Sequence, residues 1–342
     1  MVPILLSLLE KHHTYKQSRV LCRHATKAFS MCGAIMDKKT FSKDLYKFMV
    51  FVQKNEKSRG LVDDFFKISY LFNKSVAKSF AVYLPMIVRV IVNVLETPIP
   101  NQQDEPSHSR ELAKLNFALK GLINMMRYKN DTPYQPMAPF IQRMIGPLID
   151  MSLFSVSISI QNDSLDSLPT CLKLVKLQYG DQSDKTLEIF GKILNSVLFQ
   201  CSWEKNLKVL DKVLLTIGSI IKLMGNDSMT LDHVKSAMGI FEMVAEKLYD
   251  LVNRAVTSQE NRLFSINGLV IIYETIGEMV KYNSALTIPI ITSSDFLIKS
   301  NKKLLEIREK DMVKSSILYF MAQYMSMVVI LPSTLSQRSF QQ

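Results

Sequence analysis

Apolar residues recur at intervals of three and four along most of the chain, the spacing of a helix with one buried face. Alternation of apolar and polar residues, the mark of a half-buried strand, is hard to find. The pattern therefore predicts an all-helical protein with about 14 helices. They are expected at 2–12, 15–35, 41–54, 60–72, 76–95, 110–128, 138–158, 169–178, 186–200, 203–224, 230–256, 259–282, 294–309 and 311–331.

Short polar turns join most of these predicted helices, so neighbours in sequence are expected to run antiparallel. Successive pairs occupy about 35–50 residues each, which is the length of known helical repeat units. A single pair cannot bury its apolar face alone, and stacking on the next pair supplies the missing partner. We therefore expect an α-α superhelix, a solenoid of antiparallel helix pairs.

Proline and polar residues divide the chain into four expected segments. Three prolines lie within 97–109, which is predicted to be an exposed linker loop. It separates a basic helical segment at 1–96 from a helical-repeat array at 110–332, and a disordered tail is expected at 333–342. Within the array, loops are expected at 129–136, 161–167 and 284–293, where polar and turn-forming residues gather.

Two stretches carry a resemblance to a known family. Tyr83-Leu84-Pro85-Met86-Ile87-Val88-Arg89 and Met144-Ile145-Gly146-Pro147-Leu148-Ile149-Asp150 share an apolar–proline–apolar–apolar core followed by a charge. This core is similar to the second helices of HEAT repeats. The chain thus resembles the HEAT/armadillo-like superfamily of α-helical repeats. The resemblance implies a binding scaffold that presents an elongated surface to its partners.

Composition excludes several classes of protein. Hydrophobic residues make up 47% of the chain and charged residues 21%, which is enough for a large core and too apolar for a disordered chain. The 11 glycines are few for folds that rely on glycine-rich turns and phosphate loops. No nucleophile elbow, Walker loop or dinucleotide fingerprint occurs, so we expect neither an enzyme nor a cofactor.

Four cysteines and five histidines offer little metal chemistry. The cysteines are scattered, and no close Cys-x-x-Cys pair is present to hold zinc. His12, His13, Cys22, His24 and Cys32 cluster near one end, but their spacing does not bring ligands to one helix face. We expect reduced thiols, no metal site, and a nuclear or cytoplasmic location.

Positive charge is concentrated in residues 1–59, which hold twelve Lys/Arg and four Asp/Glu, a balance of +8 out of the total of +11. Arg19, Arg23 and Lys27 recur at four-residue spacing and so share a helix face. Lys16, Lys39, Lys43 and Lys47 extend this basic face. This face is a candidate site for phosphate or an acidic partner. The alternative is an ordinary solvated surface.

Segment 315–331 contains no charged residue and reaches the lower length limit of a membrane span. Its serines, glutamine and tyrosines lower its hydrophobicity, and a buried solenoid helix is the commoner cause of such a segment. Three functions thus remain: a non-enzymatic scaffold for other proteins, a chromosome-associated protein contacting nucleic acid, and an adaptor tethered by 315–331. Apolar helices close to both ends of the sequence also lead us to expect a segment of a larger helical protein.

Overall fold

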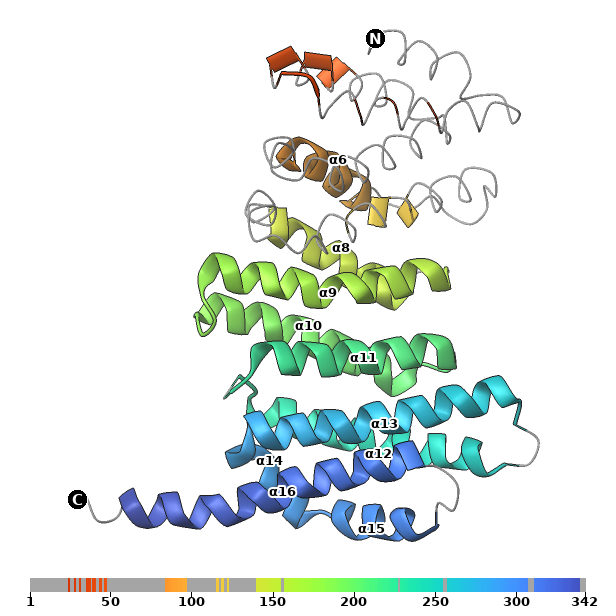
Figure 1. The fold of residues 1–342 in the computed structure, drawn as a ribbon, viewed down its shortest axis with the longest axis vertical. Helices are drawn as coiled ribbons and strands as arrows, with labels where there is room; N and C mark the ends of the chain where they lie inside the picture. Colours follow the sequence, from red (N-terminus) through yellow and green to blue (C-terminus); the bar gives the residue numbers. More distant parts are fainter. Residues whose placement is uncertain are drawn as a thin grey trace. The chain divides into compact units, whose positions relative to one another are not determined.

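The computed structural model describes 84–96, 140–154, 157–226, 228–254, 257–306 and 311–338, with scattered positions at 24–47 and 115–122. Every regular element in this described part is a helix (Figure 1). The fold is therefore all-α, as the spacing of apolar residues predicts. Contacts between residues divide the chain into two compact units, Met1–Gln178 and Tyr179–Gln342. The predicted linker at 97–109 lies outside the described residues.

Unit 1 contains α6 (Leu84–Glu96), α8 (Ile141–Phe154) and α9 (Ile158–Tyr179), which ends at the unit boundary. The two HEAT-like stretches fall on α6 and α8, and these helices pack against each other. Pro85 is the second residue of α6, where its missing N–H costs no helical hydrogen bond. The guanidinium of Arg143 on α8 donates to both carboxylate oxygens of Glu96 on α6, at 2.8 and 2.6 Å. This bidentate pair lowers the pKa of Glu96.

Unit 2 is a stack of helices built around α13 (Figure 1). Its elements are α10 (Asp184–Trp203), α11 (Leu207–Met224), α12 (Leu231–Asn253), α13 (Gln259–Tyr282), α14 (Ser284–Ser293), α15 (Phe296–Glu306) and α16 (Asp311–Arg338). Helix α13 packs against α11, α12 and α16, while α10 packs against α11 and α12. The helices thus form two layers, one of α11, α13 and α16 and the other of α10 and α12 followed by α14 and α15.

Side-chain caps fix where four helices of unit 2 begin. Ser183, Asn206, Thr230 and Ser258 each accept a hydrogen bond from a backbone N–H of the first turn. The cap of α12 is reciprocal, because Nδ1 of His233 also accepts from the Thr230 N–H at 3.3 Å. The observed starts of α10, α12 and α13 lie within two residues of the predicted ones, whereas α11 begins four residues after its predicted start at 203.

Two segments predicted as loops are helical. α9 runs through 161–167, and α14 occupies 284–293. In α9 the polar run still buries Leu165, and Ser167 Oγ donates to the Asp163 carbonyl, so the polar side chains bond to the helix itself. In α14, Thr287 and Thr292 donate in the same way to carbonyls four residues earlier. Polar composition here is compatible with a helix because these hydroxyls find local acceptors.

α16 extends to Arg338, whereas the sequence predicts a disordered tail from residue 333. The predicted helix ends at residue 331, directly before Pro332. A proline in a helix removes one backbone donor and bends the chain, and the residues that follow can continue the helix.

One helix of the described residues, α13, is long and apolar enough to cross a membrane by length and composition. Just over half of its apolar window, 56%, is buried inside the protein. Segment 315–331, the span suggested by the sequence, lies in α16. There Ile317 and Phe320 are fully buried and Ser316 is nearly so. Packing between helices thus buries part of both apolar segments.

Candidate functional site

The described part of the predicted basic face is exposed. Lys39, Lys43 and Lys47 are helical and lie in solvent, spaced four residues apart. The ammonium of Lys47 lies 3.9 Å from the Asp44 carboxylate, which partly neutralises the row. Four further cations of this face lie outside the described residues: Lys16, Arg19, Arg23 and Lys27.

The described cysteines, Cys171 and Cys201, are buried thiols outside any disulfide. Burial raises the pKa of each to about 12, which keeps them protonated at neutral pH. Cys22 and Cys32 lie outside the described residues. Among the described residues no three His, Cys, Asp or Glu side chains come together to hold a metal ion.

A cavity of about 270 Å³, lined by both apolar and polar side chains, opens where α11, α13 and α16 meet. Glu278 of α13 accepts a hydrogen bond at Oε1 from the Tyr319 hydroxyl of α16, at 2.8 Å. Its other oxygen, Oε2, is buried and has no hydrogen-bond partner. Burial, followed by the bond to Glu278, raises the pKa of Tyr319 to about 12. Glu278 thus lines the cavity and carries a second carboxylate oxygen that is shielded from water and has no hydrogen-bond partner.

Glycines lie where the helices around this cavity come closest. A Cβ at Gly277 would lie 2.8 Å from the Tyr319 ring, and a Cβ at Gly218 would lie 2.8 Å from the Thr275 hydroxyl. Glycine at these positions lets α16 and α11 approach α13 closely. Lys222 and Glu274 stand exposed beside the opening, with the 43% exposed Leu215 next to them. The opening thus carries one positive side chain, one negative side chain and an exposed leucine.

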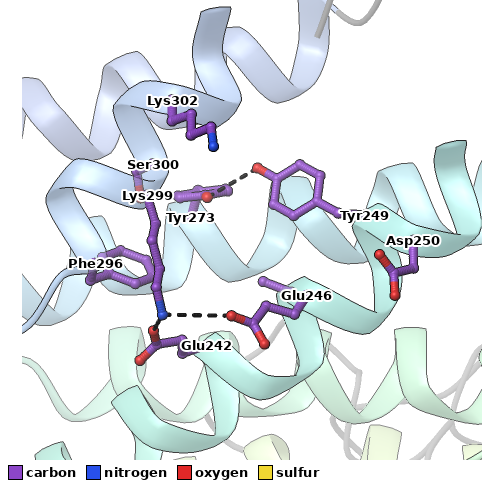
Figure 2. Close-up of a pocket in the computed structure, with 10 residues that line it drawn as sticks. Glu242, Glu246, Tyr249, Asp250, Tyr273, Phe296, Lys299, Ser300 and Lys302 are labelled. Atoms are coloured by element: carbon purple, nitrogen blue, oxygen red, sulfur yellow. Dashed lines mark hydrogen bonds and ion pairs between the residues drawn. The ribbon is translucent and has the colours of Figure 1, made fainter. Parts of the chain in front are cut away.

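A second pocket, of about 370 Å³, lies between α12 and α15 (Figure 2). Its wall on α12 carries Glu242, Glu246 and Asp250, and Lys299 of α15 reaches across to the first two carboxylates. Tyr249 donates a hydrogen bond to the Tyr273 hydroxyl at 3.0 Å. The pocket is therefore charged at its edge and aromatic within.

The acidic side of this pocket can be recognised from the sequence, whereas its contact with α15 cannot. Three acids at four-residue spacing on the predicted helix 230–256 could have been recognised as a row. Their contact with Lys299, 57 positions beyond Glu242, depends on how α15 packs and leaves no local signal. The pairing of Glu278 with Tyr319 is hidden in the same way, because 41 positions separate them.

No family model matches the sequence, and no curated protein matches it. Solved structures, in contrast, match the fold of this chain. The karyopherin Kap121p bound to the SUMO protease Ulp1p matches with a TM-score of 0.69 at 12% identity, over 95% of this chain and 32% of that chain. Kap121p bound to the extreme C-terminus of the protein phosphatase Cdc14p matches with a TM-score of 0.66 at 12% identity. The latter match covers 96% of this chain and 33% of that chain.

This chain thus spans about a third of the length of those karyopherin chains. The likeness covers nearly all of its residues, whereas the low identity restricts what is shared to the fold. The HEAT/armadillo-like resemblance of α6 and α8 is thereby confirmed at the level of the fold. The protein has an α-helical solenoid fold similar to that of these karyopherin chains.

Proposed function

We propose that this chain is a non-enzymatic helical-repeat scaffold that binds a segment of a partner protein along the layer of α11, α13 and α16. The observation that carries the proposal is the cavity at Glu278, where a buried carboxylate oxygen has no partner. A buried acceptor without a hydrogen bond costs free energy, and a donor from a bound segment would remove that cost. A backbone amide, a hydroxyl or a cationic side chain could each supply the donor.

The solved relatives support a protein partner. Kap121p, with the same fold, has been solved with a protease and with the end of a phosphatase chain. A solenoid suits this role because its stacked helices present a continuous surface to an extended segment. By the same analogy we propose that the chain works in the nucleus or the cytoplasm.

Photo-crosslinking from Leu215 tests the proposal. A photoreactive amino acid at this position, beside the cavity, is expected to capture one or a few protein partners in cells. Changing Glu278 to lysine should reduce the captured amount at least fivefold, because it replaces the acceptor by a bulky cation. The readout is the yield of each adduct by mass spectrometry.

Leu231 is the matched control, because it is 44% exposed, close to the 43% of Leu215, and lies on α12 in the other layer. A crosslinker there should not yield the same adducts. Equal capture from both positions, or capture from Leu215 that is indifferent to Glu278→Lys, would remove the proposal.

The exposed row of Lys39, Lys43 and Lys47 favours a second candidate function, contact with nucleic acid. Binding of this kind weakens steeply with salt, because each lysine that neutralises a phosphate releases a counterion. We expect the affinity for a 30-nucleotide duplex to fall about tenfold or more between 50 and 200 mM salt, and to fall further when the three lysines become glutamine. An affinity that changes neither with the salt concentration nor with the three substitutions would contradict this candidate function.

A further inference from the structure

The capping box at the start of α12 contains a histidine. Oγ1 of Thr230 accepts a hydrogen bond from the backbone N–H of His233 at 3.2 Å, and Nδ1 of His233 accepts one from the backbone N–H of Thr230 at 3.3 Å. In most capping boxes the second acceptor is glutamate or glutamine, whose side chains remain acceptors near neutral pH. An imidazole loses its acceptor at Nδ1 when it takes up a proton. The box is therefore complete only while His233 is neutral.

The imidazole ring of His233 also packs against α10. It meets the ring of Phe190 edge-on, with 5.9 Å between the ring centroids. Gly191 allows this approach, because a Cβ at that position would lie only 3.3 Å from Cε1 and 3.4 Å from Nε2 of the imidazole. His233 is therefore half-buried, in contact with both the first turn of α12 and α10.

The surroundings of the imidazole favour its neutral form. Burial lowers the pKa of His233, and the neighbouring carboxylate of Asp232 opposes this shift only in part. The first turn of a helix carries a partial positive charge, which repels a cation. The charged residues of α10 next to the contact, Glu188 and Lys192, are exposed to solvent, and α14, which also packs on α12, contains no charged residue. A proton on His233 is thus poorly compensated.

We propose that His233 is a pH-sensitive switch at the contact between α10 and α12. In its neutral form it completes the capping box and holds the start of α12 against α10. A proton from solvent binds at Nδ1, the atom that accepts the Thr230 N–H, so protonation breaks this hydrogen bond and loosens the start of α12. The inference does not depend on the proposed function, because His233 is in the other layer and does not line the cavity at Glu278.

The direction of the pH effect follows from the pKa of His233 in the two states of the chain. In the unfolded chain this pKa is about 6.5, above its value in the folded protein. Between the two values the unfolded state binds more protons, so the free energy of unfolding falls as the pH falls. The stability that neutral His233 contributes is therefore complete above about pH 6.5 and is lost as the pH falls through the pKa of the folded protein.

The first experiment compares urea unfolding of unit 2 at pH 7.5 and pH 5.5, followed by Trp203 fluorescence. From the higher to the lower pH, the unfolding equilibrium constant of the unchanged chain should rise about fivefold more than that of His233→Gln. Glutamine can complete the same capping box and does not titrate. Burial raises the pKa of Asp211, but this carboxyl group titrates in both chains and cancels in the comparison.

His24→Gln is the matched control, because it removes an exposed histidine of unit 1. His233 is the only histidine in the sequence of unit 2, so His24→Gln should keep the full pH effect. An equal rise in the unchanged chain and in His233→Gln would overturn the proposal, and so would loss of the effect in His24→Gln.

The second experiment follows the proton itself, by nuclear magnetic resonance of the chain with isotope-labelled histidine and threonine. The imidazole signal that disappears in His233→Gln belongs to His233. Its titration midpoint is expected below pH 6.5, with the neutral ring protonated at Nε2, and the amide signal of Thr230 should shift with the same midpoint. A midpoint at or above pH 6.5, a neutral ring protonated at Nδ1, or a Thr230 amide that does not respond would contradict this switch.

Discussion

Replacing Phe320 by alanine is expected to lower the free energy of unfolding of unit 2 by about 3–5 kcal/mol. Phe320 is one of the largest fully buried side chains among the described residues. Its ring lies 5.6 Å from that of Phe296 and 6.3 Å from that of Tyr273, so it joins α16 to both α15 and α13. Alanine would leave a cavity at this junction, because the three helices around it can close in only partly.

Trp203 fluorescence during urea unfolding measures this change, because it is the single tryptophan and lies in unit 2. Leu318→Ala is the control on the same helix, and at 54% exposure it should change the free energy by less than about 0.5 kcal/mol. If the two substitutions had equal effects, the aromatic cluster would not be the core of this region.

Replacing Gly277 by valine is expected to destabilise unit 2 by about 2–3 kcal/mol through overpacking. A Cβ there would lie 2.8 Å and 3.0 Å from two atoms of the Tyr319 ring and 3.5 Å from the Phe320 Cα. The ring would have to move, and its hydrogen bond to Glu278 would be lost with it. The substitution should therefore also disturb the cavity proposed to bind a partner.

Gly239→Val on α12 provides the comparison, because a Cβ at that position meets nothing within 4 Å. Valine is a slightly better helix former than glycine, so this change should be neutral or stabilise by a few tenths of a kcal/mol. Urea unfolding of both variants, followed by Trp203 fluorescence, measures the difference. Similar stability of the two would show that α13 and α16 do not approach as closely as described.

Helix positions in unit 2 could be predicted well from the sequence, because spacing and caps both act locally. The predicted helix 259–282 has the same bounds as α13, since Ser258 caps its start and the apolar pattern covers its length. Trp203 was expected to begin a helix and instead ends α10. The next helix, α11, begins after its cap Asn206. The apolar residues before Asn206 continue the helical spacing, so the spacing alone does not show the break.

The candidate sites could be predicted only in part. The basic face and the acidic row are visible in the sequence because their members are close neighbours on single helices. The cavity at Glu278 arises where three helices meet, and it needs glycine at Gly218 and Gly277 for close approach. Such packing depends on the whole arrangement of helices, so no local sequence pattern predicts it.

Hydrogen–deuterium exchange, compared between the free chain and its complex with the protein captured at Leu215, tests the central claim most directly. The account predicts slower exchange in α11, α13 and α16 around the cavity at Glu278, with α10 and α12 unchanged. Glu278→Lys should abolish this protection, and the exchange of the free variant, measured alongside, separates the loss of binding from the loss of the Tyr319 hydrogen bond. Protection confined to α10 and α12, or none in either layer, would contradict a scaffold that binds its partner on this face.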